Sequence, residues 1–223
     1  MDMLSLVEHF LDKESLQDTL CYYGDVFIRG ILRPCIEWRS GIPNVKIREA
    51  AILCLKKLLE KKLIEQEAFQ RNFLDIFNNL KGCLDDDFSS DIRYASIVLV
   101  RLMISFTGVK MEYDDYKEVY PELLKRLDDS QDGIRLEAAK SFEDYFEVLP
   151  EEWAPNLFEY MVENIYIHLD DSEEIIQQAI TRVLKQAAKV HKDVVINIGT
   201  AMSSKFKHQF AIDSLLSQLK ESN

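Results

Sequence analysis

The stretch Leu127-Asp128-Asp129-Ser130-Gln131-Asp132-Gly133-Ile134-Arg135 determines how this chain folds, because its pattern recurs. Similar phrases begin at Leu84 and Leu169, each with two aspartates followed some positions later by an isoleucine. The aligned isoleucines lie 45, 42 and 42 residues apart, at Ile47, Ile92, Ile134 and Ile176. A period of roughly 40 to 47 residues is typical of HEAT and armadillo arrays. We therefore expect an all-α solenoid of stacked antiparallel helix pairs.

Apolar residues within each repeat follow helical spacing. In the third repeat this spacing predicts a first helix over 116–127 and a second over 134–149, with Pro150 just past its end. We expect one HEAT-repeat domain over 1–223, with about four full repeats, an N-terminal half-repeat and a C-terminal hairpin. The half-repeat is apolar, whereas a true end of an array carries a polar cap. The chain is thus expected to be the C-terminal part of a longer array.

The charge of the chain indicates which partners it binds. Its 223 residues carry a net charge of −12, which argues against nucleic acid and anionic membranes, because both attract clustered Lys and Arg. The longest apolar stretch, 97–106, is short for a membrane span and contains Arg101. The sequence has no N-terminal targeting pattern. We therefore expect a cytoplasmic protein whose partners are other proteins.

The paired aspartates allow two interpretations. Paired carboxylates can hold a cation or share a proton. Each pair also falls in a turn between two helices, where a carboxylate accepts backbone N–H groups and meets the positive end of the next helix. We favour this structural role and expect a ladder in which Arg93 and Arg135 bond Asp86 and Asp129. Because Gln177 replaces the arginine in the fourth copy, the ladder should end there.

Signatures of catalysis are missing from the sequence. It has no Gly-rich phosphate loop, no Gly-x-Ser-x-Gly elbow and no His-Glu-x-x-His. The four cysteines lack zinc-type spacing. Two helical-repeat enzymes also fit poorly: the hypusine hydroxylase needs His-Glu pairs, and the alkylpurine glycosylases need a basic face. We expect no enzyme, no metal or other cofactor and no small-molecule substrate.

Two runs near the C-terminus carry a family resemblance. They are Tyr-Pro-Glu-Leu-Leu-Lys-Arg-Leu-Asp-Asp, which begins at Tyr120, and Ile-His-Leu-Asp-Asp at 167–171, followed by 178–180 and 183–185. Together they resemble the C-terminal end of the HEAT-repeat dynein axonemal assembly factors, the fifth of that named set, most clearly over 113–221. The resemblance implies a cytoplasmic, non-enzymatic scaffold that preassembles dynein arms. Its partners would be axonemal dynein chains, other dynein assembly factors or chaperones.

Candidate contact residues come from charge and aromatic content. The stretch 112–152 holds fourteen acidic and five basic residues, and Glu143 and Glu147 lie one turn apart on its second helix. Among the aromatic residues, most of which fit core spacing, we expect exposure for the two partner-binding candidates Tyr113 and Trp153. The basic tail supplies the remaining candidates, Arg182, Lys185 and Lys189. The alternative function is a fragment of another HEAT scaffold, such as a phosphatase regulatory subunit or an importin-like transport receptor.

Overall fold

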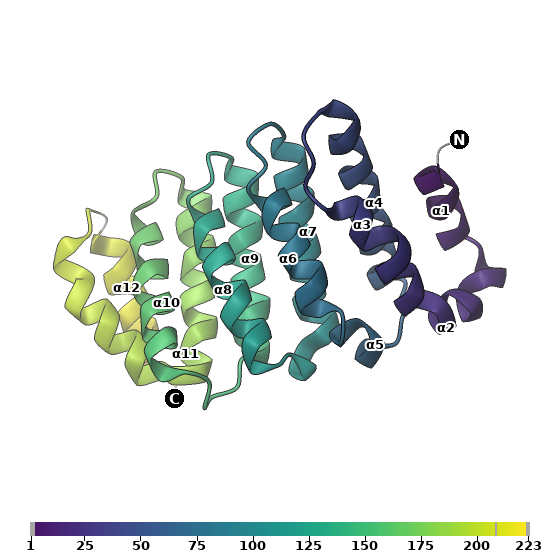
Figure 1. The fold of residues 1–223 in the computed structure, drawn as a ribbon. Coiled ribbons are helices and arrows are strands. Elements are labelled where there is room, and N and C mark those ends of the chain that lie inside the picture. Colours follow the sequence, from purple (N-terminus) through teal and green to yellow (C-terminus); the bar gives the residue numbers. More distant parts are fainter. Residues whose placement is uncertain (1–2, 208, 222–223) are drawn as a thin grey trace. The chain divides into compact units, whose positions relative to one another are not determined.

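Helices account for nearly all the regular structure of the chain, as the period of its sequence predicts. The computed structural model describes residues 3–207 and 209–221, and no β-strand occurs among them (Figure 1). The chain divides into two compact units, Met1–Val119 and Tyr120–Asn223, and the division falls within helix α8 (Tyr113–Leu127). That 1–223 forms a single domain stays a prediction.

The first unit contains a half-repeat and two helix pairs. Its half-repeat is α1 (Met3–Leu11), which packs against α4. The first pair joins a bent helix, α2 (Gln17–Phe27), η2 (Ile28–Leu32) and α3 (Arg33–Ile36), to α4 (Ile42–Glu60). The second pair joins α5 (Gln66–Gln70) and α6 (Phe73–Leu84) to α7 (Ser90–Thr107). Short 3-10 turns complete the unit at Glu14–Leu16 and Gly108–Lys110.

Helix α7 is the second helix of the second pair. Its start is capped by Ser89, whose Oγ accepts the backbone N–H of Ile92 at 3.2 Å. The segment Ser90–Lys110 is long and apolar enough to cross a membrane by length and composition. However, α7 packs against α4, α5 and α6, and its apolar residues from Ile92 to Ile104 are largely buried there. The apolar composition is therefore that of a core helix.

One expected core residue is exposed. Ile92, Ile134 and Ile176 are buried, but Ile47 is 42% exposed, so the prediction of four equivalent buried isoleucines is wrong for the first copy. In the other copies the isoleucine is the third residue of its helix, directly after the turn. Helix α4 begins at Ile42, so Ile47 lies more than one helical turn beyond the chain reversal. The next residue, Arg48, is buried in its place.

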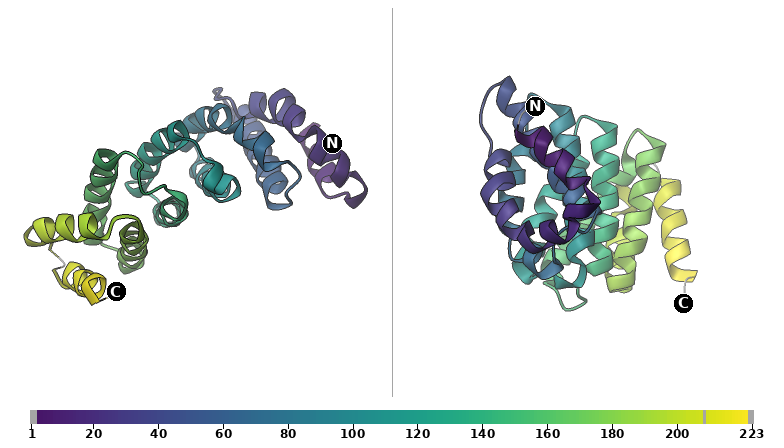
Figure 2. Two further views of the ribbon diagram at one scale, coloured as in Figure 1. Left: turned by 90° about the horizontal axis from the view of Figure 1, so that it is seen from below. Right: turned by 90° about the vertical axis from the view of Figure 1, so that its right-hand side faces the viewer.

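The second unit contains the remaining two pairs and the hairpin. After α8 come α9 (Asp132–Val148), α10 (Pro155–Ile167), the 3-10 turn η4 (His168–Asp170) and α11 (Glu174–Met202). Helix α11 packs against α9, α10 and α12 (Gln209–Glu221). The second helices α9 and α11 pack side by side in this unit, which Figure 2 shows from two further directions.

The first helix of the C-terminal hairpin is the last part of α11. His191 has φ −139° and ψ 84°, so it breaks the helix and separates the fourth repeat from the hairpin. The hairpin then turns through Ser203–Lys205 into α12. It is fixed to the repeat by Tyr166, whose hydroxyl donates to the Val195 carbonyl at 2.9 Å. A Cβ on Gly199 would lie 2.5 Å from that hydroxyl oxygen, so only glycine fits there.

Candidate functional site

The inter-helix turns share one hydrogen-bonding arrangement. The second aspartate of each pair places its Oδ1 at the start of the following helix, where it accepts backbone N–H groups. Asp86 accepts from Phe88 and Ser89 at 3.0 Å, Asp129 accepts from Gln131 at 3.0 Å, and Asp171 accepts from Glu173 at 2.9 Å. Asp86 and Asp129 are buried. The structural interpretation of the aspartates therefore has a geometric basis in the three copies that carry them.

The residue after the repeat isoleucine closes each turn. Arg93 donates to the Asp86 carbonyl oxygen at 2.9 Å, and Arg135 donates to the Asp129 carbonyl oxygen at 3.2 Å. Gln177 makes the same bond to the Asp171 carbonyl oxygen at 2.7 Å. The aspartates named by the sequence are thus contacted through their backbone carbonyls. Glutamine reproduces this bond because an amide N–H reaches the same acceptor.

A second bond links Arg48 and Arg135 to the turn of the next repeat. In the first unit, Arg48 Nη2 lies 2.5 Å from Asp86 Oδ2, and both side chains are almost fully buried. In the second unit, Arg135 Nε lies 3.3 Å from Asp171 Oδ2. These two arginines thereby each connect two consecutive turns. Gln177 has no positive charge, so it can close its own turn but cannot form the ion pair.

Arg48 is the ladder residue that the sequence reasoning missed. The first copy of the repeat, which contains Arg48, lacks the aspartates, so the sequence offers no acceptor for Arg48 in its own turn. The structure supplies the Arg39 carbonyl oxygen instead, at 2.6 Å from Arg48 Nη1. The signal was the alignment itself, because Arg48 occupies the same place after its isoleucine as Arg93 and Arg135.

The charged contact candidates lie together on the second helices of the second unit. Glu143 of α9 pairs with Arg182 of α11, with Glu143 Oε1 3.2 Å from Arg182 Nε. Glu147, Lys185 and Lys189 are exposed. The acidic candidates and the basic candidates, considered separately in the sequence, therefore form one mixed-charge face of α9 and α11. Its acidity is partly neutralised where Glu143 and Arg182 meet.

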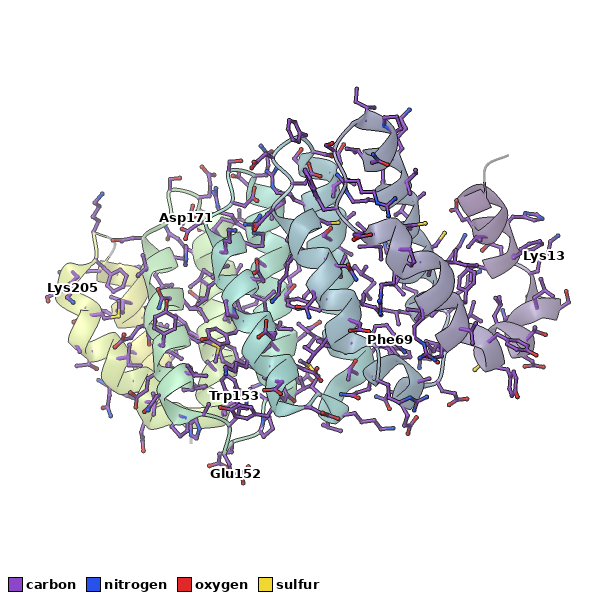
Figure 3. The ribbon with its side chains drawn as sticks, viewed as in Figure 1. Lys13, Phe69, Glu152, Trp153, Asp171 and Lys205 are labelled. Carbon is purple, nitrogen blue, oxygen red and sulfur yellow. The ribbon has the colours of Figure 1, made fainter. Side chains whose placement is uncertain are left out.

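The aromatic candidates differ in exposure. Tyr113 is exposed as expected, but Trp153 is only 4% exposed, so its predicted exposure is wrong. The indole packs edge-to-face on Tyr120, with ring centroids 6.1 Å apart. Trp153, in the loop between α9 and α10, folds back onto its own repeat because burial of its large aromatic surface is favourable. Figure 3 places Trp153 and Asp171 at opposite ends of the helices of the second unit.

A groove also opens between the first helices of the second unit. Its walls are Tyr120 and Leu124 of α8 and Tyr160 and Ile167 of α10. His168 lies at its edge, and burial lowers the pKa of this imidazole while Asp128 and Asp171 oppose the shift.

The four cysteines differ in burial. Cys54 and Cys83 are buried, whereas Cys21 and Cys35 are half-buried. Burial raises the pKa of the Cys83 thiol to about 11, which disfavours a nucleophilic thiolate. Within 3–207 and 209–221, no group of three His, Cys, Asp or Glu side chains is arranged to hold a metal ion.

Comparisons of sequence show relatives along most of the chain. It is 29% identical over 202 residues to dynein axonemal assembly factor 5 of Mus musculus, covering 89% of this chain and 24% of that protein. The Xenopus laevis protein of the same name is 26% identical over 209 residues, covering 92% and 25%. The chain thus spans about a quarter of the length of these relatives. No protein-family model matches it.

Solved structures with the same fold include designed repeat proteins. Computationally designed armadillo repeat proteins for modular peptide recognition match with a TM-score of 0.56 and 13% identity, over 100% of both chains. A designed armadillo repeat protein in complex with peptide (KR)4 matches with a TM-score of 0.55 and 13% identity, over 99% of both. The predicted resemblance is confirmed: the chain is an all-α repeat solenoid, similar in sequence to dynein axonemal assembly factor 5 over about nine-tenths of its length.

Proposed function

We propose that this chain is a non-enzymatic scaffold for the cytoplasmic preassembly of axonemal dynein arms. The observation that carries the proposal is the similarity to dynein axonemal assembly factor 5, which extends along almost the whole chain in three vertebrate proteins. The repeat architecture supports it, because stacked helix pairs present extended surfaces for other proteins. The partners are axonemal dynein chains, other assembly factors or chaperones.

The mixed-charge face of α9 and α11 is the proposed contact surface. Its acidic residues favour basic partner segments, since complementary charge raises association rates. Glu147 contributes most, because it is exposed, whereas Glu143 is already paired with Arg182. A designed neighbour of the same fold holds a (KR)4 peptide, which makes a basic peptide a suitable first probe.

Pull-down from ciliated cells with mass spectrometry tests this function. Dynein heavy or intermediate chains, or other dynein assembly factors, should be recovered with the chain as bait. Recovery of phosphatase subunits or nuclear-transport cargo without any dynein component would favour the alternative HEAT scaffolds. Metal analysis of the purified protein, combined with hydrolase screening, addresses the enzymatic alternative.

The contact surface is tested by charge reversal. E143K/E147K should slow association with a basic client several-fold at low salt and weaken its salt dependence, because two carboxylates of the face become cations. The matched control is E159K on the first helix α10, where an equally exposed glutamate lies outside this face. Equal binding by E143K/E147K and E159K, with both variants folded, would place the contact surface elsewhere.

A further inference from the structure

An apolar cup lies at the turn end of the first unit. Its walls are formed by Trp38 and Ile42 from one segment and by Phe88 from another, and the partly open cavity that they line is about 270 Å³. The three side chains are strongly exposed: Phe88 is 84% exposed, Ile42 is 76% exposed and Trp38 is 48% exposed. Exposed apolar residues gathered in one place mark interaction sites more often than single ones do.

The cup is a built feature, because one buried arginine holds both of its walls. Arg48 donates from Nη1 to the Arg39 carbonyl oxygen, which fixes the Trp38 wall. Its Nη2 bonds Asp86 Oδ2, and Asp86 Oδ1 in turn accepts the backbone N–H of Phe88. The loop that carries Trp38 ends at Gly41, whose φ of +99° is one that favours glycine.

The equivalent turns show that the hydrogen bond made at Phe88 does not need an aromatic side chain. Its backbone N–H makes the bond that Gln131 and Glu173 make in the third and fourth copies, and both of those residues are polar. The turn therefore accepts a polar side chain at this place. A phenylalanine exposed to water here gives the turn no additional hydrogen bond.

The surroundings of the cup determine the chemistry of its occupant. A cavity of this size is smaller than ordinary small-molecule sites, so it has room for one bulky side chain. The turn segment 85–91 contains four aspartates and no basic residue, and Asp87 and Asp91 are exposed beside Phe88. On the opposite wall, Arg39 is paired with Glu37 at 3.1 Å.

We propose that the cup formed by Trp38, Ile42 and Phe88 binds a protein segment that presents a bulky apolar side chain next to basic residues. The apolar side chain fills the cavity, and the basic residues meet Asp87 and Asp91. This surface belongs to the turns of the first unit and is separate from the charged face of α9 and α11. Binding at the cup does not depend on which partner the α9 and α11 face binds.

The probe is a nine-residue peptide with a central Phe flanked by two Lys on each side. Two related peptides replace the Phe by Ala or the Lys by Glu. The chain has two tryptophans, Trp38 in the cup wall and Trp153 buried in the second unit, so two indole N–H signals report the site by NMR. The Phe and Lys peptide should shift the Trp38 signal and leave the Trp153 signal unchanged.

The variant F88Q should weaken this peptide at least fivefold, because it installs the side chain of the third copy while preserving the turn. Its matched control is F210Q, since Phe210 of α12 is 86% exposed and lies outside the cup. D87N/D91N should reduce the salt dependence of binding. The Ala and Glu peptides should each bind at least fivefold more weakly than the probe.

Three results would overturn the proposal. The first is a Trp38 signal that none of the peptides shifts. The second is equal peptide binding by folded F88Q and F210Q. The third is a Trp38 signal that shifts with protein concentration in the absence of peptide, together with the loss of that shift in the F88Q variant. This result would make a second copy of the chain the occupant.

Discussion

Replacing Arg48 with methionine tests the ladder at its most buried link. The guanidinium is 2% exposed and bonds Asp86 Oδ2 at 2.5 Å and the Arg39 carbonyl oxygen at 2.6 Å. Methionine preserves much of the apolar length but leaves the buried Asp86 carboxylate without its cation. Breaking a buried pair in this way costs about 3–5 kcal/mol. R48M should therefore lose about that much unfolding free energy.

The matched comparison is R135M in the second unit. Arg135 and Asp171 are partly solvated, with side-chain exposures of 16% and 12%, and their closest atoms are 3.3 Å apart. A longer and more solvated ion pair contributes less to the unfolding free energy, about 1–2 kcal/mol. Urea denaturation followed by circular dichroism measures both variants. A double-mutant cycle with D86N isolates the coupling of Arg48 to Asp86.

A loss of less than about 1 kcal/mol of unfolding free energy in R48M would contradict this role of Arg48, because a buried unpaired carboxylate would then be tolerated. A larger loss of unfolding free energy in R135M than in R48M would contradict it as well. A coupling energy near zero in the cycle would mean that Arg48 acts through packing alone.

Three further predictions test the core, one close contact and one titration. I134A should cost about 2–4 kcal/mol because its side chain is fully buried, whereas I47A should cost under about 1 kcal/mol; thermal denaturation compares them. G199A should lower the unfolding free energy by about 1–3 kcal/mol, because its Cβ would clash with the Tyr166 hydroxyl. G30A should be neutral or stabilising, because a Cβ there meets nothing within 4 Å. A destabilising G30A would contradict this packing. The lowered pKa of His168 means that the unfolded chain binds the proton first as the pH falls through about 6.5. Unfolding free energy should drop between pH 7.5 and 5.5, and H168N should flatten that slope; an unchanged slope would exclude this histidine.

The repeat fold could be predicted from the sequence because its signals are local and periodic. Helical spacing, the turn aspartates and the proline after the third repeat each identify an element within a few positions. The C-terminal hairpin was also predicted. The residue that separates it from the fourth repeat was not, because His191 breaks α11 without a Pro or Gly signal.

The site was predicted less well, because its contacts join residues about forty positions apart. The partner of Arg48 is Asp86 in the next turn, and the partner of Glu143 is Arg182 on the next second helix. Helical periodicity shows which face a residue occupies but not which residue lies opposite it. Trp153 was misplaced for the same reason, since its burial depends on Tyr120 of another helix.

Crosslinking mass spectrometry in extracts of ciliated cells tests the scaffold function most directly. A lysine-reactive crosslinker has two exposed targets on the α9 and α11 face, Lys185 and Lys189. We expect crosslinks from these lysines to axonemal dynein chains or to other dynein assembly factors. Crosslinks from this face only to components unrelated to dynein, or dynein crosslinks confined to other surfaces, would contradict it.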